Sequence, residues 1–237
     1  MKELLRNIIF LDIETVRLTC SFEELDDRMQ AAWIKKSAWL SRDNDKSPEE
    51  TYNDRAAIHA EFGRVVVIGM GIIHEVDGEW VLRTKALYDE DETRLLQSFR
   101  EVLGRTKQDE LMLCAHNGKE FDFPYLSRRM RINRIPLSRA LDISGKKPWE
   151  IQHLDTMEMW KFGDFRHYTS LDLLATLFDI ESSKTDMDGS EVGETFYTEK
   201  DPEKIMDYCL RDVEVTARLF LHLKGWHDVS IRVERKD

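Results

Sequence analysis

The apolar positions near the start of the chain form one short, continuous run that predicts a buried strand. Residues 7–14 (NIIFLDIE) are apolar until two acids close the run, which is typical of a central strand. Residues 15–62 are polar, and we expect a helical insertion there. Two further runs, RVVVIGMGIIHEV and GEWVLRTKALY, meet at Asp77–Gly78. An Asp-Gly turn between two strand-like runs predicts a hairpin.

The rest of the chain alternates between short apolar runs and helical patterns. We expect a short strand at LMLCAHN, a short apolar piece at IQHLDTM, and helices near residues 91–104, 123–132, 170–180 and 202–224. Residues 181–200 are expected to form a polar connection and residues 226–237 a tail. Strands that alternate with helices after an opening hairpin indicate an α/β fold, with a mixed sheet covered by helices.

Length and composition limit the class of protein. The 237 residues fit one α/β domain, residues 1–237, with the 15–62 segment as an insertion. No apolar run reaches membrane-spanning length, and the first residues lack the apolar segment of a signal peptide. The three cysteines, Cys20, Cys114 and Cys209, show no paired spacing. The lack of paired spacing favours reduced thiols, which are typical of a cytoplasmic protein. The lack of a membrane-spanning run argues against a membrane partner.

The charge of the chain argues against one mode of nucleic-acid binding. A net charge of −11 does not suit binding through a general basic face, but it leaves open a nuclease that holds phosphate through bound cations. The charge is also uneven, because residues 128–147 carry seven basic residues and one acid, Asp142. Two interpretations stay open for this stretch: a surface that steers a nucleic-acid strand, or an ordinary solvated helix face and loop.

Two acids at the end of the first strand are candidates for a metal site. Side chains alternate along a strand, so Asp12 and Glu14 share one face with Ile8 and Phe10. Two carboxylates on one face near the carboxyl end of a buried strand can bind one cation or bridge two, and ligands of α/β proteins gather at such ends. The alternative is a strand that frays into solvent, where acids cost little.

A third acid lies among core positions of the last helix. Asp201 is a good N-cap and Pro202 suits the first helical position. At about 100° per residue, Asp212 projects from the middle of an apolar stripe formed by Ile205, Cys209, Thr216, Leu219, Phe220 and Leu223, and Tyr208 flanks it one turn earlier. A buried acid needs compensation, by a cation, by a buried Arg or by protonation.

The fourth acid, Asp122, follows an Asn-Gly turn and precedes a helix that we expect Pro124 to open. Asn117 and Gly118 form a turn that can bring the backbone close to a ligand. The simplest alternative for Asp122 is an N-cap, and Asn117 could be a plain turn residue.

Taken in order, IIFLDIET, HNGKEFDFPYL and YCLRDVEVT resemble the exonuclease motifs of the DEDD superfamily of 3′–5′ exonucleases. The YxxxD form of the third motif is similar to the tyrosine subgroup, DEDDy, which includes the proofreading domains of family-B DNA polymerases. The resemblance runs from about Ile8 to Leu223. It implies a ribonuclease H-like fold, which we expect as a mixed five-stranded sheet with helices on both faces.

The resemblance also implies roles for individual residues. By it, the metal-binding acids are Asp12, Glu14, Asp122 and Asp212, and they would hold two Mg²⁺ or Mn²⁺ ions. Tyr208 corresponds to the tyrosine that positions the attacking water, and Asn117 matches a polar residue near the scissile end. Thr15 and Phe123, next to the acids, are further expected substrate contacts, although the apolar side chain of Phe123 is also suited to packing.

A second pair of residues competes for the third motif. His167 and Asp172 (HYTSLD) imitate the histidine form of that motif. Asp172 lies about 100° from the local apolar stripe, and with Ser170 as N-cap it fits a first-turn acid. We therefore favour the tyrosine form.

The expected activity is stepwise hydrolysis from the 3′ end of a single strand, which releases nucleoside 5′-monophosphates. DNA is the favoured substrate. The alternatives are RNA and a catalytically silent domain that binds nucleic acid or protein, with a replication or repair protein as a possible partner. Aromatic side chains that could stack on bases are Phe62, Trp149, Trp160 and Tyr168. The oligomeric state is not indicated by the sequence.

Overall fold

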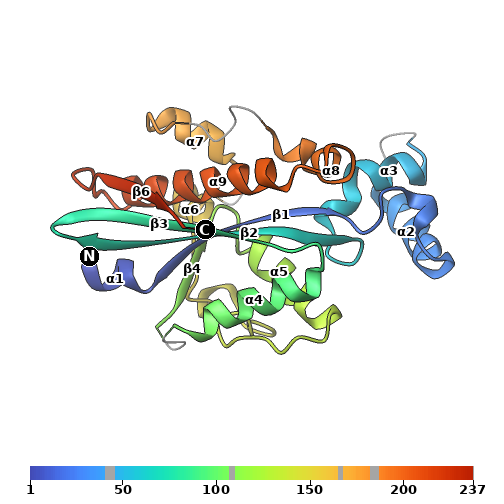
Figure 1. Ribbon diagram of the computed structural model, residues 1–237, viewed down its shortest axis with the longest axis horizontal. Coiled ribbons are helices and arrows are strands. Elements are labelled where there is room, and N and C mark those ends of the chain that lie inside the picture. The colour runs from blue at the N-terminus through green and yellow to red at the C-terminus, as the bar shows by residue number, and fades with distance from the viewer. Residues whose placement is uncertain (41–45, 107–109, 165–167, 182–186, 237) are drawn as a thin grey trace.

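A six-stranded mixed sheet forms the centre of the computed structural model (Figure 1), in the order β5-β4-β1-β2-β3-β6. The structure describes residues 1–40, 46–106, 110–164, 168–181 and 187–236. The strands are β1 (Ile8–Arg17), β2 (Gly63–Val76), β3 (Glu79–Tyr88), β4 (Met112–Ala115), β5 (Leu154–Asp155) and β6 (Ile231–Arg235). β1 is antiparallel to β2 and parallel to β4, so the sheet is mixed as expected.

The sheet has one strand more than the five expected. Residues 231–235, which the sequence analysis assigned to a tail, form β6 and pair in parallel with β3 at Trp80–Thr84. The tail prediction is wrong for this segment. Three of its five residues (IRVER) are charged, and a short, charged strand at the edge of a sheet carries little apolar pattern to reveal it.

The helices are α1 (Lys2–Arg6), α2 (Asp27–Leu40), α3 (Pro48–Arg55), α4 (Glu92–Gly104), α5 (Asp122–Ile132), α6 (Thr156–Lys161), α7 (Leu171–Leu177), α8 (Val192–Glu194) and α9 (Pro202–Leu223). α4, α5, α7 and α9 lie close to their expected positions, and α2 and α3 lie in the expected helical insertion, whereas α1 and α6 were not expected. The described part of the expected polar connection, 187–200, contains α8 and short helical turns on either side of it. The hairpin turn is confirmed, since Asp77 and Gly78 both have positive φ, at 53° and 87°.

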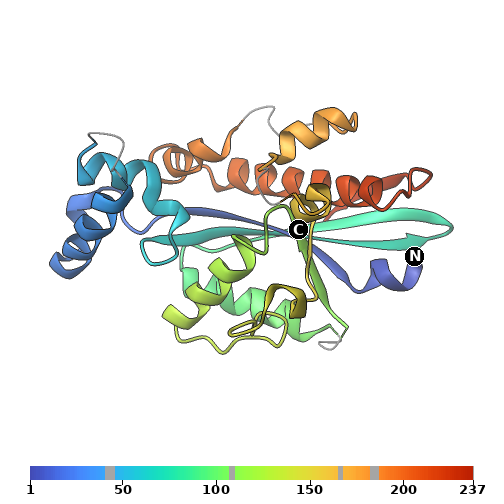
Figure 2. The same ribbon diagram turned by 180° about the vertical axis from the view of Figure 1, so that it is seen from behind.

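Helices cover both faces of the sheet (Figures 1 and 2), as expected. α9 packs on one face against Ile8 and Phe10 of β1, whereas α4 and α5 pack on the other face against Ile9, Leu11 and Ile13. The side chains of β1 therefore point alternately to the two faces of the sheet, as the sequence predicts. The face that α9 covers is the one that also carries Asp12 and Glu14.

The helical insertion lies at one end of the sheet (Figure 1) and has a small core of its own. Because β1 continues to Arg17, the helical part begins with a short turn at Phe22–Glu24 and not at residue 15. Its core consists of Phe22, Leu25, Trp33, Tyr52, Ala56 and Phe62. Phe62 is only 7% exposed, which rules out the base-stacking role considered for it.

Candidate metal-binding active site

The acid pair lies in the middle of β1, which continues to Arg17, and not at the end of the strand as expected. α9 partly encloses the pair. Glu14 is 7% exposed and Asp12 is half-buried, so neither lies on a fraying strand end. The backbone at this point belongs to a central strand: Asp12 pairs with Gly69 of β2 and Glu14 with Val67. The pairing with β2 thus fixes the backbone positions from which the two carboxylate side chains project.

α9 brings a tyrosine, a cysteine and a third acid to the same place. Asp201 caps the helix by accepting the N–H of Lys204, and Pro202 is its first residue, as expected. The Cys209 thiol lies 3.3 Å from Asp12 Oδ2 and 3.4 Å from the Asp12 carbonyl oxygen, and donates to this residue. Tyr208 is 6% exposed and Asp212 is half-buried. α9 is therefore in direct contact with β1 at the acid pair.

Asp122 reaches β1 from the opposite side of the sheet. It is the first residue of α5 and is 4% exposed, and its carboxylate accepts a hydrogen bond from the backbone of Ile13. β4 pairs with β1 only at Ile8–Phe10, so this edge of β1 is open beyond Phe10. The helix begins two residues before Pro124, and Asp122 is not its N-cap, a position that Phe121 occupies without a side-chain bond.

The acids raise one another's pKa values. Burial and neighbouring carboxylates raise the pKa of Asp12 well above its usual range; the carboxylates, in order of effect, are Asp212, Glu14 and Asp122. Burial, followed by the charge of Asp212 and then of Asp122, raises the pKa of Glu14 in the same way. The charges of four acids from β1, α5 and α9 therefore act on one another.

The pKa values of Asp122 and Tyr208 are also raised. Burial, followed by the charges of Asp155 and Asp212, raises the pKa of Asp122 to about 7. Burial and then the charge of Asp212, with smaller effects from Glu14 and Asp12, raise the pKa of Tyr208. The phenol is therefore protonated at neutral pH and can donate a hydrogen bond, but it is a poor base.

The donor set fits a divalent cation. One ligand atom each from Asp12, Glu14 and Cys209 lies within 4.8 Å of the others, and the charges of Asp122 and Asp212 act on this group. Buried carboxylates that repel one another are stabilised by a cation, and carboxylate oxygens suit Mg²⁺ or Mn²⁺. The thiol of Cys209 is a softer donor that the sequence analysis assigned only to the core stripe.

The three expected substrate contacts differ in their surroundings. Asn117 lies in the turn after β4 with φ of 63°, and its Oδ1 atom is buried without a hydrogen-bond partner in the described structure. Thr15 is half-buried and hydrogen-bonds the Tyr125 hydroxyl. Phe123 is fully buried and packs on Gly118 and His153. Since a side chain without accessible surface cannot contact a substrate, we correct Phe123 to a packing role.

The competing histidine motif is partly outside the described residues, because His167 lies in 165–167. Asp172 is in the first turn of α7, and Ser170 caps that helix by accepting the N–H of Leu173. The position of Asp172 is the one expected for a first-turn acid.

Sequence reasoning missed Asp155, a buried acid next to the site. Asp155 is 3% exposed, ends β5 and caps α6. The sequence contains a signal for it, because Asp155 and Glu158 have the spacing of a capping pair at the start of a helix. That signal predicts a helix start at Thr156, where the sequence analysis saw only an apolar piece.

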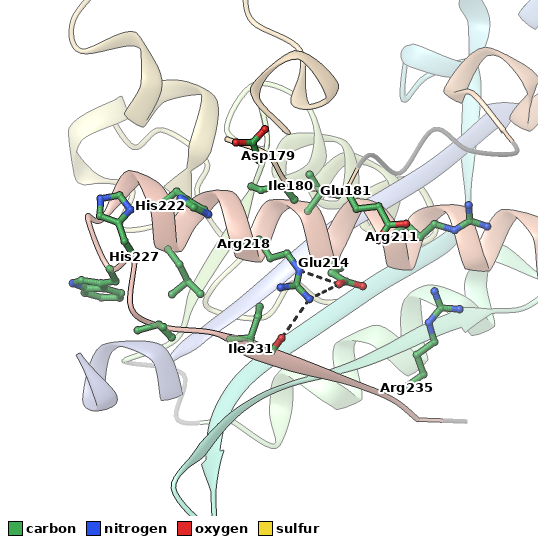
Figure 3. Close-up of a pocket in the computed structure, with 14 residues that line it drawn as sticks. Asp179, Ile180, Glu181, Arg211, Glu214, Arg218, His222, His227, Ile231 and Arg235 are labelled. Atoms are coloured by element: carbon green, nitrogen blue, oxygen red, sulfur yellow. Dashed lines mark hydrogen bonds and ion pairs between the residues drawn. The ribbon is translucent and has the colours of Figure 1, made fainter. Parts of the chain in front are cut away.

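A pocket of about 600 Å³ lies elsewhere on α9, between this helix, β6 and residues 179–181 (Figure 3). Its lining includes Arg211, Arg218 and Arg235 but, among the described residues, none of the four acids. Arg218 donates to Glu214 and to the Ile231 carbonyl. The pocket is thus distinct from the acid site, and the hydrogen bond from Arg218 to Ile231 joins α9 to β6.

The basic stretch and the exposed aromatics are at the surface. Arg129 is the exception: it is buried and forms an ion pair with Glu92, so it serves the core. The other basic residues of the stretch are exposed, namely Arg128, Arg131, Arg134, Arg139, Lys146 and Lys147. Trp149 and Tyr168 are 78% and 72% exposed, whereas Trp160 packs edge-on against Phe178. Both interpretations of the stretch stay open.

The structure is an α/β domain with a mixed sheet, an acid pair on a central strand, and further acids from helices on each face. The comparisons with known proteins agree. Residues 56–230 match the family described as a predicted 3′–5′ exonuclease related to the exonuclease domain of PolB, and this chain belongs to that family. The matched range leaves the acid pair on β1 outside it.

Individual relatives are DNA polymerases of archaea. DNA polymerase 1 of Sulfolobus acidocaldarius is 32% identical over 143 residues, which are 55% of this chain and 15% of that polymerase. The family B DNA polymerase of Pyrobaculum calidifontis superimposes with a TM-score of 0.59 at 18% identity, over 92% of this chain and 24% of that one. The second likeness confirms the ribonuclease H-like fold. The chain spans less than a quarter of either polymerase.

No helix in the described part of the chain is both long enough and apolar enough to cross a lipid bilayer. The three cysteines are free, with Cys20 exposed and the other two buried.

Proposed function

We propose that this chain is a divalent-metal-dependent 3′–5′ exonuclease of the tyrosine subgroup, working as one domain on single-stranded DNA ends. The observation that carries the proposal is the shared site of four buried or half-buried acids, each of which raises the pKa of at least one other group in it. Burying like charges together is costly unless a cation joins them. Together with the family, this makes metal-assisted phosphodiester hydrolysis the best-supported activity.

Some residues of the site would hold metal ions, and one would orient the attacking water. Asp12, Glu14, Asp122 and Asp212 would hold two Mg²⁺ or Mn²⁺ ions. When bound, such a pair activates a water for attack on phosphorus and stabilises the departing 3′ oxygen. Tyr208, which keeps its proton because its pKa is raised, donates a hydrogen bond that orients the water.

Asn117 is the substrate contact with the best local support. Its buried Oδ1 atom lacks a partner in the described structure, and buried polar atoms are rarely left unpaired. A hydroxyl of the terminal sugar would satisfy it. Thr15 follows Glu14 on β1 and is the second proposed contact, through its backbone, because its side chain is occupied by Tyr125.

The test is an end-trimming assay with 5′-labelled DNA and RNA oligonucleotides of one sequence, in Mg²⁺, in Mn²⁺ and in EDTA. We expect a ladder of products that shorten from the 3′ end, release of nucleoside 5′-monophosphates, and no products in EDTA. The matched control is a double variant, Asp12→Asn with Asp212→Asn, purified in parallel. DNA is the expected substrate because the relatives are DNA polymerases.

Other outcomes would point to the alternatives. Faster trimming of RNA would make this an exoribonuclease. No trimming of either oligonucleotide, with no change in stability on adding Mn²⁺, would favour a silent domain that binds nucleic acid or a protein, including a replication or repair partner. A cytoplasmic location is part of the proposal, and fractionation of cells that express the tagged chain would test it.

A further inference from the structure

Asp155 uses both carboxylate oxygens to hold backbone that surrounds the acid site. Its Oδ1 atom accepts the N–H groups of Met157 at 2.9 Å, Glu158 at 3.2 Å and Asn117 at 3.0 Å. Its Oδ2 atom accepts the N–H of Lys119 at 3.0 Å. Both oxygens are committed to backbone donors, so this buried acid is not a free metal ligand.

The four hydrogen bonds join two segments that are far apart in sequence. Two of them cap α6, as any N-cap residue would do. The other two cross to residues 36 and 38 positions earlier, in the turn after β4. β4 and β5 are parallel neighbours, with Ala115 opposite Asp155, so the carboxylate lies where the turn leaves the sheet. A simple helix cap would not explain the second pair of bonds.

The turn that Asp155 holds, residues 117–119, leads directly to the acid site. Asn117 has a left-handed conformation, with φ of 63°, which costs free energy for a residue other than glycine and needs support from its surroundings. The Gly118 carbonyl then accepts the N–H of Phe123, next to Asp122. Movement of the turn would therefore shift both Asn117 and Asp122.

A second side chain, His116, also joins the turn after β4 to the start of α6. The His116 ring lies 2.8 Å from the Thr169 carbonyl through Nε2 and 2.9 Å from the Thr156 hydroxyl through Nδ1. Burial lowers the pKa of His116, so the ring is neutral; Nε2 donates to the carbonyl, and Nδ1 accepts from the hydroxyl. The start of α6 is thus fastened to the turn at two points, Asp155 and His116.

We propose that Asp155 is a positioning residue of the nuclease site: its carboxylate fixes the 117–119 turn against α6 and thereby holds Asp122 and Asn117 in place for metal and substrate. This inference rests on the proposed function. Asp155 acts on the turn through its backbone hydrogen bonds, and its charge also raises the pKa of Asp122.

The experiment compares Asp155→Ala and Asp155→Asn with a matched cap variant, Asp91→Ala. Asp91 caps α4 by accepting the N–H of Thr93, and its bonds involve no residue of the acid site. Three experiments are made on each purified protein: calorimetry for Mn²⁺ affinity, steady-state kinetics for kcat and KM on a DNA oligonucleotide, and amide hydrogen exchange at Asn117 and Lys119.

We expect Asp155→Ala to weaken Mn²⁺ binding and lower kcat by about 10–100-fold, the range for partners that support metal ligands, with KM changed less. Exchange at Asn117 and Lys119 should accelerate. Asp155→Asn should be milder, since its oxygen can keep the three bonds of Oδ1. Asp91→Ala should lose stability without any of these effects. If Asp155→Ala does not fold, the comparison of Asp155→Asn with the wild type tests the inference. We then expect faster exchange at Lys119 but not at Asn117, and a loss of Mn²⁺ affinity that is smaller than the one expected for Asp155→Ala.

Two results would overturn the inference separately from the function. An active wild type with an Asp155→Ala variant that matches Asp91→Ala in kcat and Mn²⁺ affinity would leave the nuclease proposal intact and remove the positioning role. Unchanged exchange at both amides in a folded Asp155→Asn and Asp155→Ala would remove it as well. A wild type that neither binds Mn²⁺ nor trims DNA overturns both proposals.

Discussion

Gly69 of β2 and Cys209 of α9 are in such close contact that a Cβ atom on the glycine would lie 2.8 Å from the cysteine Sγ. The same Cβ would lie 3.2 Å from the Cys209 carbonyl oxygen, so the helix backbone itself is near. Gly69 is the pairing partner of Asp12, and Cys209 donates to Asp12. The missing side chain at residue 69 therefore allows α9 to approach the sheet at the point where the acids meet.

The first prediction concerns this contact. Gly69→Ala should push α9 away from β1, destabilise the protein by about 1–3 kcal/mol, as overpacking does, and reduce exonuclease activity because Asp212 moves with the helix. Denaturant unfolding and kcat measure the two effects. Gly104→Ala is the control, because Gly104 ends α4 and, in the described part of the chain, no atom outside its own helix and chain neighbours lies within 4 Å of its added Cβ. Equal behaviour of the two variants would contradict the prediction.

The second prediction separates activity from stability at the acid site. Asp12→Ala and Asp212→Ala should lose nearly all activity, since each removes one of the carboxylates proposed to hold metal. Without metal, Asp212→Ala should raise the melting temperature by about 2–4 °C, which corresponds to about 1 kcal/mol for a chain of this length. The reason is that Asp212 is the charge that most raises the pKa of Asp12 and of Glu14.

Calorimetry in EDTA and an end-trimming assay check this pair of effects. The control is Asp172→Ala, which removes the first-turn acid of α7 and should leave activity near the wild-type level. Full activity in either metal-site variant would exclude the metal-site assignment.

The third prediction concerns the orienting tyrosine. Tyr208→Phe removes the hydroxyl but keeps the ring, so kcat should fall less than in the acid variants, while Mn²⁺ affinity stays close to that of the wild type. Single-turnover rates at saturating Mn²⁺ measure the effect. His167→Ala is the comparison that tests the competing motif. If Tyr208→Phe equals the wild type and His167→Ala is inactive, the tyrosine assignment is wrong.

The fourth prediction concerns pH. The pKa of Asp122 is about 7 in the folded protein, against a usual value of 3.8, so the folded state binds the proton more tightly than the unfolded state. An acid with a raised pKa stabilises the fold fully below about pH 4, and this contribution is lost as pH rises through about 7. In EDTA, unfolding at pH 8 should thus need less denaturant than at pH 5.5.

Bound metal should reverse the dependence of stability on pH, because a bound cation favours the ionised carboxylates. Adding Mn²⁺ at pH 8 should restore stability, whereas at pH 5.5 the gain should be smaller since protons compete with the metal. Asp122→Asn should flatten the pH dependence in EDTA. The same pH dependence of stability in EDTA for the wild type and for Asp122→Asn would contradict the assignment of a raised pKa.

Local patterns in the sequence were sufficient for most of the elements. Alternation along β1 put Asp12 and Glu14 on one face, the Asp77–Gly78 pair gave the hairpin turn, and Asp201 with Pro202 gave the start of α9. These features depend on neighbouring residues only. β6 was missed because a short, charged edge strand is defined by its partner β3 and not by its own pattern.

What the sequence by itself determined is the set of acids and the faces from which they project, because strand and helix periods fix side-chain direction within each element. Tertiary structure alone decided how those faces meet. It buried Phe123 in the core, joined Cys209 to Asp12, and committed Asp155 to the turn that precedes Asp122. Such contacts link residues that are tens to hundreds of positions apart, and no local period carries information about them.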